Sequence, residues 1–397
     1  MTPRRIVIAM VEPPLPFGSA PSRWYYVLLK GLVARGHRVT AFASCAKANE
    51  IEQAATHFPP DRYDLRCFAH PVRSGLAAKV ESARRPYSYM FSPEMRASLQ
   101  HELDQGFDVL HLEQLWCGWL GLGHADRSLV NVHHLVSIDL EDGRAAPWLP
   151  WFQNQLAFRT ERKLMQAFHY VRSCSPRLEQ PLRDMNPGAS ITTVPVGIDA
   201  SVYDFIPDSR RPQTPVIGLI GSMAWYPGYS AAVRLLTRLY PQIRRAVPDV
   251  TVRIAGWSAR SALREFVDLP GVEIVENVAD VRPFFESLGV MLYAPIRGSG
   301  MKIKVLEAMS FGVPVVTTTE GVEGLPAEDG VHAGIADDDQ GLIDRTVAML
   351  RDPARQNLQR RAARALVESH CSPETTVSAI ESIYEAMGSD RNGSNRL

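Results

Sequence analysis

The sequence has 397 residues, of which 45% are hydrophobic and 22% are charged, as in a globular protein of two or three domains. Lysine and arginine together number 43, and aspartate and glutamate together also number 43, so the formal net charge is zero. A general nucleic-acid-binding protein is markedly basic, so this balance argues against one and no nucleic-acid partner is expected.

The sequence predicts a cytoplasmic chain with reduced cysteines. The apolar stretch before Glu12 is too short for a signal peptide, and no run approaches the roughly 20 apolar residues that a membrane-spanning helix needs. The five cysteines are far apart, and no two of them form a Cys-x-x-Cys pair. Neither a disulfide framework nor a zinc site is therefore expected.

Strand-like and helix-like segments alternate through the first half of the chain. A β-branched run at 5–11 leads through a proline-rich loop into a helical pattern at 23–35, which stops at Gly36. Such alternation predicts a parallel sheet with helices on both faces. Further strands of this sheet are predicted at 39–43, 108–112, 129–133, 170–174 and 191–196.

The alternation is interrupted at 199–215, where three prolines lie among charged and polar residues, as in an exposed linker. A second alternating series follows, with a helix predicted at 231–247. Two doubly wound α/β domains are therefore expected at residues 1–205 and 206–371, followed by a last segment at 372–397. Strands of the second domain are predicted at 216–220, 250–255, 272–275, 290–294 and 313–318.

The strongest motif lies in the second domain, where a strand at 290–294 runs into a Gly/Ser loop and then into a helix predicted at 301–311. This order puts free backbone N–H groups and the positive end of a helix at the carboxyl edge of a strand, which favours an anion site. The positive side chains of the motif strengthen that expectation. The candidate residues are Arg297, Gly298, Ser299, Gly300, Lys302 and Lys304.

Glu307 follows in the same predicted helix. Gly300, Lys304 and Glu307 would share one helical face, with Glu307 about 10 Å along it from Gly300. A diphosphate at the helix start would leave its ribose hydroxyls near this carboxylate. The alternative is a solvated helix with a Lys304–Glu307 ion pair worth a few tenths of a kcal/mol. Loop, charges and carboxylate together favour the binding site, although no ATPase-type phosphate loop is present.

The first domain offers weaker candidates. Its first loop has only Gly18 where a dinucleotide site needs Gly-x-Gly-x-x-Gly, which argues against a nicotinamide dehydrogenase. Gly18 either lets the backbone approach a ligand or is a turn glycine.

His133 and His134 end an apolar strand, so at most one of them faces a given cleft, and each is either a ligand-contacting or a structural histidine. Arg23 faces a cleft or, more simply, a solvated turn, and Glu161 is expected on a solvated helix face rather than as a base.

Two further clusters lie in the second domain. Gly221 and Ser222 follow the strand at 216–220 and can contact phosphate or sugar, and Met223 belongs to the same loop. Trp225 and Tyr226 are either ligand contacts or interdomain packing. The three aspartates at 337–339 look like a metal site, but they directly precede a predicted helix, so capping and dipole compensation explain them better.

Several of these phrases resemble a glycosyltransferase of the GT-B fold, of the retaining family 4 type (glycosyl transferases group 1). The resemblance covers most of the chain, and its most specific phrase is Gly-Ser-Gly-x-Lys-x-Lys-x-Leu-Glu-Ala-Met at 298–309. Other matching phrases are Arg-Gly-His-x-Val-Thr at 35–40, the segment 132–137 with His133 in the place of the family's cleft histidine, and Gly-Val-Glu-Gly-Leu at 321–325.

The resemblance implies two Rossmann-like domains that face each other across a cleft, with the segment 372–397 forming a helix that returns toward the first domain and then a disordered tail. It implies transfer of a sugar from a nucleotide-diphosphate donor, with UDP-sugar favoured and GDP-sugar possible, to an acceptor hydroxyl with retention. No metal or other cofactor is implied. Catalytic roles fall to His133, Arg297 and Lys304, and donor contacts to Gly18, Gly221, Ser222, Met223, Gly298, Ser299, Gly300, Lys302, Leu306 and Glu307.

The chain departs from the family pattern in three places. Ser299 stands where the family often has the first of two glutamates, usually linked to the donor sugar, and Val196 replaces a common asparagine. The basic pair expected in 223–228 is missing, which shifts the phosphate role to the three cations of the 298–309 motif and its preceding loop. An epimerase of the same fold, or a non-catalytic binding protein, therefore stays an alternative.

The acceptor is expected on the first domain, as a glycan or lipid-linked glycan. The segment 73–96 combines Lys79, Arg84 and Arg85 with several aromatic residues. It either meets a membrane-borne acceptor at the inner face of a membrane or is an ordinary solvated surface, which is the simpler interpretation.

Overall fold

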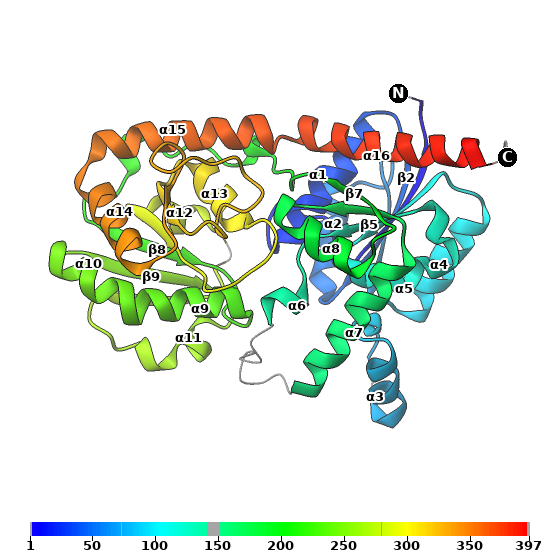
Figure 1. Cartoon of the computed structure of the whole chain (residues 1–397), viewed down its shortest axis with the longest axis horizontal. Helices are drawn as coiled ribbons and strands as arrows, with labels where there is room; N and C mark the ends of the chain where they lie inside the picture. Colours follow the sequence, from blue (N-terminus) through cyan, green and yellow to red (C-terminus); the bar gives the residue numbers. More distant parts are fainter. Residues whose placement is uncertain (1, 73, 141–150, 279, 395–397) are drawn as a thin grey trace. The chain divides into compact units, whose positions relative to one another are not determined.

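The computed structural model describes residues 2–72, 74–140, 151–278 and 280–394 (Figure 1). Its contacts divide the chain into two compact units. Unit 1 comprises Met1–Ser137, Pro150–Ile198 and Pro373–Leu397, and unit 2 comprises Ile138–Leu149 and Asp199–Ser372. Each unit contains one parallel β-sheet with helices around it, as the alternation of strands and helices predicts.

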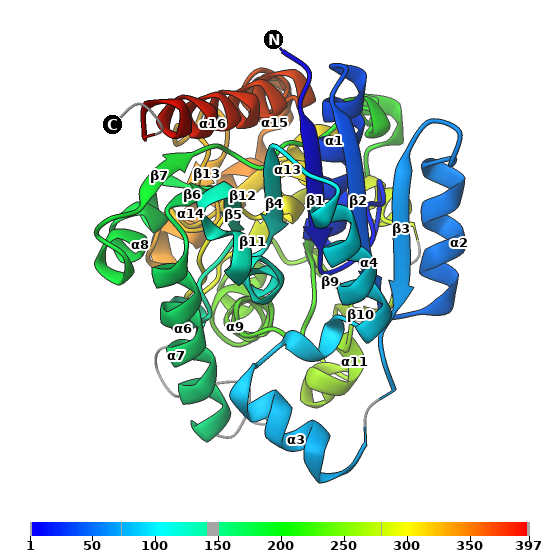
Figure 2. The same ribbon diagram turned by 90° about the vertical axis from the view of Figure 1, so that its right-hand side faces the viewer.

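The sheet of unit 1 has seven parallel strands in the order β3-β2-β1-β4-β5-β6-β7 (Figure 2). The strands are β1 (Arg5–Met10), β2 (Arg38–Cys45), β3 (Asp64–Ala69), β4 (Val109–Glu113), β5 (Ser128–Val132), β6 (Tyr170–Ser173) and β7 (Ser190–Thr193). The helices are α1 (Ala20–Ala34), α2 (Ala48–His57), α3 (Gly75–Arg84), α4 (Pro93–Asp104), α5 (Gly118–Gly121), α7 (Trp151–Ala167), α8 (Glu179–Met185) and α16 (Pro373–Ser394). The short helix α6 (Val136–Asp139) begins in unit 1 and ends in unit 2.

The sheet of unit 2 has six parallel strands in the order β10-β9-β8-β11-β12-β13. They are β8 (Val216–Ile220), β9 (Thr251–Gly256), β10 (Val272–Glu276), β11 (Val290–Tyr293), β12 (Val315–Thr317) and β13 (Gly334–Ile335). The helices are α9 (Tyr226–Arg234), α10 (Tyr240–Ala246), α11 (Ala259–Ala262), α12 (Arg282–Glu286), α13 (Ile303–Phe311), α14 (Asp339–Arg351) and α15 (Pro353–His370). A π-helical segment, Leu235–Leu239, joins α9 to α10.

Continuous apolar runs form the central strands because both faces of a parallel sheet are covered. All five residues of β8 are buried, and so are all four of β11. The helix predicted at 231–247 begins earlier, at Tyr226, because Pro227 sits in its first turn, where a missing N–H is harmless. Two strands escaped the sequence analysis: β3, whose residues are mostly half-buried, and β13, which has two residues.

Both sheets reverse their order of growth at one point, between β1 and β4 in unit 1 and between β8 and β11 in unit 2. Ligands of open parallel sheets bind beyond the carboxyl ends of the strands at such a switch point. In unit 1 this places the end of β4, Glu113, at the favoured position. In unit 2 it places Gly221, after β8, and the loop from 294 to 302, after β11.

The linker predicted at 199–215 is bound to unit 2 by two arginines of α15. Arg364 donates from Nη1 to the carbonyl of Tyr203 at 2.6 Å and from Nη2 to that of Ala200 at 2.8 Å. Arg360, which is 1% exposed, contacts the carbonyl of Ile206 and the carboxylate of Asp208. These bonds explain why unit 2 begins at Asp199, although the sequence pattern placed the boundary after residue 205.

Helix α16 follows unit 2 in the sequence but packs in unit 1 against α1. Oε1 of Glu381 lies 2.8 Å from Nε2 of His37, and Oε2 lies 3.1 Å from Nη1 of Arg35. The hydroxyl of Tyr384 contacts Nδ1 of His111 in β4. Among the described residues, none of the helices has both the length and the apolar character that crossing a membrane requires.

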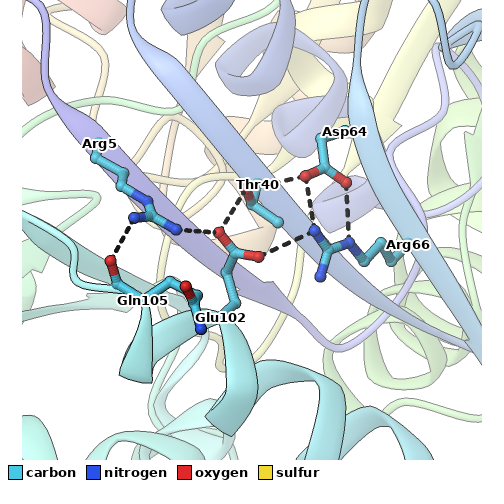
Figure 3. A network of polar contacts seen from close by, with 6 residues as sticks. All are labelled: Arg5, Thr40, Asp64, Arg66, Glu102 and Gln105. Atoms are coloured by element: carbon cyan, nitrogen blue, oxygen red, sulfur yellow. Dashed lines mark hydrogen bonds and ion pairs between the residues drawn. The ribbon is translucent and has the colours of Figure 1, made fainter.

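A charged network joins the amino-terminal ends of three strands of unit 1 to α4 (Figure 3). Glu102 accepts from Nη2 of Arg5 at 2.7 Å and from Nη2 of Arg66 at 3.0 Å. Arg66 also bonds both oxygens of Asp64, which in turn accepts from Thr40. The network therefore ties together the amino-terminal ends of these strands, whereas the switch point lies at their carboxyl ends.

Candidate functional site

The carboxyl end of the unit 2 sheet carries a group of basic and glycine residues, here called the basic edge: Gly221, Arg297, Lys302 and Lys304. Nζ of Lys304 lies 4.3 Å from the centroid of the Tyr293 ring, at the end of β11. A Cβ at Gly221 would lie 2.7 Å from the same Nζ. Because Gly221 has no side chain, it leaves the space that the ammonium group occupies. Lys304 therefore contacts the carboxyl ends of both strands at the switch point, β8 and β11.

The environment of Lys304 disfavours its positive charge. Burial of the amino group and, to a smaller extent, the charge of Lys302 lower its pKa, and Glu307 acts in the opposite direction, with a net value of about 8. The residue as a whole is partly exposed, but its charged end lies against a ring and a backbone. An anion at this position would stabilise the charged form, so the geometry suits a phosphate or diphosphate.

Helix α13 begins at Ile303, with Lys302 at its N-cap, rather than at Met301 as predicted. Gly300 has a φ of 73° and lies outside the helix, so the expectation that Gly300 shares a helical face with Lys304 and Glu307 is wrong. The left-handed conformation at Gly300 turns the chain before the helix can start. Lys304 and Glu307, three residues apart within α13, do share a face.

Glu307 is 3% exposed, so the alternative of a solvated helix face is wrong for this residue. Lys302 is also held locally: its Nζ contacts the carbonyl of Gly300 and lies 3.5 Å from Oε2 of Glu323. A Cβ at Gly298 would meet the Lys302 side chain at 3.4 Å. Lys302 is therefore part of a compact loop.

Ser299, which stands in the place of a family glutamate, binds a carboxylate instead of supplying one. Its backbone N–H donates to Oδ1 of Asp139 at 2.6 Å, and its Oγ donates to the same oxygen at 2.8 Å. Asp139 is 1% exposed and belongs to unit 2 by its contacts. The sequence analysis missed Asp139, since nothing in the sequence links two residues 160 positions apart.

The other predicted donor-contact residues of unit 2 lie in different surroundings. Ser222 is exposed, while Met223 and Leu306 are 0% and 1% exposed. The Met223 and Leu306 side chains belong to the core, and the backbone N–H of Met223 donates to the carbonyl of Trp257 at 2.9 Å. The structure thus brings Gly221, Lys304 and Glu307 into one neighbourhood and uses Met223 and Leu306 for packing.

The carboxyl end of the unit 1 sheet carries a second group, here called the histidine edge: His111, Glu113, Asn131 and His133. Glu113 is 0% exposed and accepts from Nδ2 of Asn131 at 2.6 Å and from Nε1 of Trp24 at 3.0 Å. Its oxygens lie 3.1 Å from Nε2 of His111 and 2.9 Å from Nε2 of His133. Burial alone would raise the pKa of this carboxyl, but the two histidines hold it well below its usual value.

His133, the predicted cleft histidine, follows β5 and has a 10% exposed side chain. Burial lowers its pKa, Glu113 opposes that shift, and the charge of Arg172 adds to it. Its ring contacts that of Tyr25 edge-on, with centroids 6.3 Å apart. Gly18 lies in the loop after β1, exposed, with a φ of 89° and no atom within 4 Å of a built Cβ, which is the geometry of a turn.

Two sequence interpretations in unit 1 are wrong. Glu161 is 1% exposed rather than solvated, because its carboxylate accepts from the N–H groups of Val136 and Ser137 at 2.7 and 3.1 Å and so caps the start of α6. Arg23 is 9% exposed and is not on a solvated turn. Both side chains are buried by neighbours distant in sequence, which a helical pattern alone does not indicate.

Of the three aspartates at 337–339, the capping interpretation is confirmed for Asp338. Asp338 is the N-cap of α14 and accepts from the N–H of Gly341 at 2.8 Å. Asp337 accepts from Thr319, and Asp339 lies 2.8 Å from Nε of Arg234. In the part of the chain that the structure describes, no group of three or more histidine, cysteine or carboxylate side chains is arranged to hold a metal ion.

Two family models match the chain, one in each half. Residues 22–202 match the model for Glycosyltransferase Family 4, and residues 214–352 match that for Glycosyl transferases group 1. Glycogen synthase of Mycobacterium tuberculosis is 24% identical over 422 aligned positions, which cover 96% of this chain and 94% of that protein.

Solved structures show the same fold at low identity. Sucrose-phosphate synthase from Thermosynechococcus elongatus aligns with a TM-score of 0.74 and 15% identity, over 98% of this chain and 100% of that one. Anabaena HepE in complex with UDP and glucose aligns with a TM-score of 0.68 and 13% identity, over 96% and 100%. With the two parallel sheets and the matched motifs, these findings show that the chain belongs to the glycosyltransferases of the GT-B fold.

Proposed function

We propose that this glycosyltransferase moves a sugar from a nucleotide-diphosphate donor, with a UDP-sugar favoured, to the hydroxyl of a glycan or lipid-linked glycan, with retention of configuration. The observation that carries the proposal is the position of Lys304, whose ammonium group lies at the switch point of unit 2, beside Gly221 and in the first turn of α13. A helix start and a cation whose charge burial disfavours form a site for a diphosphate.

The chemistry follows from the leaving group. As the glycosidic bond to the donor breaks, negative charge grows on the nucleoside diphosphate, and fixed positive groups lower the barrier by stabilising it. Lys304, Arg297 and the amino end of α13 supply that charge, so we propose a reaction that needs no metal ion or other cofactor. Glu307, buried three residues beyond Lys304, would bind the ribose hydroxyls.

UDP is favoured because three structural neighbours are HepE complexes whose bound molecules are UDP and glucose, UDP-glucose, and UDP. The test is a thermal-shift panel with UDP-, GDP- and ADP-sugars and NAD, on the wild type and on Glu307→Ala. A ligand at 100 times its dissociation constant adds about 2.7 kcal/mol to the free energy of unfolding. We expect one nucleotide class to raise the Tm of the wild type, and less so that of the variant.

If only NAD raised the Tm, or if no nucleotide sugar raised it, the proposal would be wrong. Added EDTA should leave the shift and the transfer rate unchanged. Mass spectrometry of the products separates transfer from epimerisation, since an epimer keeps the mass of the donor and a transferred sugar adds to the acceptor.

We also propose contact with the inner face of a membrane through α3 and Val72. Val72, Leu76 and Val80 are 102%, 78% and 44% exposed, and Leu76 and Val80 lie one turn apart on α3. The basic residues Lys79, Arg84 and Arg85 are also exposed. Apolar groups next to positive charge suit an anionic lipid surface.

Sedimentation with vesicles tests the membrane contact. Wild type should bind vesicles rich in phosphatidylglycerol and not pure phosphatidylcholine, and Leu76→Ser with Val80→Ser should lose that binding. Equal binding by the double variant would show that α3 is an ordinary solvated surface. A matched control is Leu358→Ser, at a residue of unit 2 that is 74% exposed.

A further inference from the structure

A continuous line of polar side chains runs through the interior of unit 1 from α16 to the histidine edge. It begins at Tyr384, whose hydroxyl contacts Nδ1 of His111, and passes from Nε2 of His111 to Glu113 at 3.1 Å. From the other oxygen of Glu113 it reaches Nε2 of His133 at 2.9 Å. Tyr384, His111 and Glu113 are each 0% exposed, so water does not compete for these contacts.

Glu113 is the negatively charged member of this series of side chains. A carboxylate buried in an apolar interior is costly unless donors surround it, and besides His133 Glu113 has two side-chain donors, Asn131 at 2.6 Å and Trp24 at 3.0 Å, while Nε2 of His111 lies 3.1 Å away. An ionised carboxylate only accepts hydrogen bonds. Each group that faces Glu113 must therefore present a hydrogen to it, and the nitrogen that His133 presents is Nε2.

This requirement determines where His133 carries its proton. Burial, the largest cause, and the charge of Arg172 lower the pKa of His133 although Glu113 acts in the opposite direction, and the net shift favours a neutral imidazole, with one N–H and one lone pair. Since Nε2 donates to Glu113, the lone pair is on Nδ1. A neutral imidazole with this tautomer accepts a hydrogen bond at Nδ1 and cannot donate one there.

We propose that Glu113 is a positioning residue, which holds His133 as the Nε2–H tautomer so that Nδ1 accepts a hydrogen bond from a hydroxyl of the donor sugar. The inference rests on the proposed function and deepens it. The histidine then selects donors that carry a hydroxyl at the contacted position, because a sugar with a deoxy or O-methyl group there has no hydrogen to offer. The contact between Tyr384 and His111 holds the second imidazole that faces the same carboxylate.

The first test is spectroscopic and needs no substrate. Long-range proton–nitrogen NMR of the wild-type protein distinguishes a protonated Nε2 from a protonated Nδ1, and the signals of His133 are assigned by their loss in His133→Asn. We expect protonation at Nε2. A wild-type His133 with the proton on Nδ1, or on both nitrogens at pH 7.5, would overturn the proposal, even if every Glu113 variant proved unstable.

The second test uses Glu113→Gln, whose amide can donate to Nε2 and so shift the proton of His133 to Nδ1. We expect this NMR change together with a fall in kcat of about 10- to 100-fold, the usual effect of losing such an orienting group. Glu113→Asp should recover part of the loss, and Tyr384→Phe should show a smaller loss than Glu113→Gln. Unchanged kcat in a folded Glu113→Gln variant would also overturn the proposal.

The thermal shift with UDP separates this inference from the proposed function. UDP carries no sugar, so its shift should be the same in wild type and Glu113→Gln. If no nucleotide raises the Tm of the wild type and no sugar is transferred, the proposed function is wrong. The NMR measurement still determines the tautomer of His133 in that case. Normal UDP binding with an unaffected tautomer in Glu113→Gln contradicts the positioning role alone.

Discussion

The basic edge and the histidine edge occupy the same position in two similar sheets, but they treat a buried charge in opposite ways. Glu113 is surrounded by donors from the protein itself, and its pKa falls, so its charge is stabilised before any ligand arrives. Lys304 lies on an aromatic ring near another lysine, and its pKa also falls, which for a cation means that its charge is disfavoured. The first arrangement orients a side chain; the second one favours an anion from outside.

The largest effect should come from removing the cation of the basic edge. In the proposed reaction Lys304→Ala loses the charge that would stabilise the leaving diphosphate, so we expect kcat/KM for sugar transfer to fall about 10²- to 10³-fold, as when one oxyanion-stabilising donor is removed. Steady-state kinetics with a UDP-sugar measures this. Arg253→Ala, at a half-buried cation of the same unit that pairs with Glu273, should leave kcat/KM nearly unchanged. Equal losses in both variants would point to a general change in charge rather than to Lys304.

A smaller effect is expected at Gly221. Alanine there would place a Cβ 2.7 Å from Nζ of Lys304, at a φ of 154°, so the lysine must move and the backbone is mildly strained. We expect UDP binding to weaken by about tenfold and the Tm to fall by a few degrees, for a strain of about 1 kcal/mol. Calorimetric titration gives the affinity. Gly123→Ala, with no atom within 4 Å of its built Cβ, is the control.

The pH dependence of UDP binding should sharpen the comparison further. The ammonium group of Lys304 loses its proton as the pH rises through about 8, so the affinity for UDP should fall above that pH by at most tenfold per unit. The ligand-free protein should gain stability from this group between about 8 and 10.5, because the unfolded chain holds the proton longer. Lys304→Arg stays charged, so its affinity should change less. A parallel decline in both proteins would assign the effect to another group.

The smallest effect should appear at the amino-terminal edge of the unit 1 sheet, where Glu102 bonds Arg5 and Arg66 (Figure 3). Burial alone would raise the pKa of Glu102, but the two arginines lower it below its usual value of 4.5. Its stabilisation is therefore complete above pH 4.5 and is lost as the pH falls through the lowered pKa. Glu102→Gln should cost about 1 kcal/mol at pH 7, with the difference vanishing in acid.

Thermal unfolding followed between pH 7 and pH 3 measures the Glu102 effect. Transfer activity at neutral pH should be unchanged, because this edge lies at the opposite ends of the strands from the histidine edge. A large loss of activity in a stable Glu102→Gln variant would contradict the assignment of the two edges.

The sequence analysis was most successful where structure is local. The strand at 290–294, the glycine loop and the helix with Lys304 and Glu307 are neighbours in the chain, so their order alone predicted the basic edge. The start of that helix was misplaced by two residues, because the φ of Gly300 depends on the folded loop.

The histidine edge shows what local patterns do not contain. His133 was a candidate, but its partner Glu113 was not, although a carboxylate that ends a buried strand at a switch point is a usable signal. The contact between His111 and Tyr384 joins residues 273 positions apart, and that between Asp139 and Ser299 joins residues 160 apart. Such pairs result from tertiary packing and have no trace in composition or periodicity.

The return of α16 to unit 1 has a consequence for how the chain is made. Nearly all of unit 2 is one stretch, Asp199–Ser372, whereas unit 1 is completed by residues that leave the ribosome afterwards. His37 and His111 are synthesised more than 270 residues before their partners Glu381 and Tyr384. Until α16 is made, the two histidines of the nascent unit 1 therefore lack these contacts. The residues of the basic edge are therefore all synthesised before Tyr384, so the histidine edge gains its contact with α16 only after they have been made.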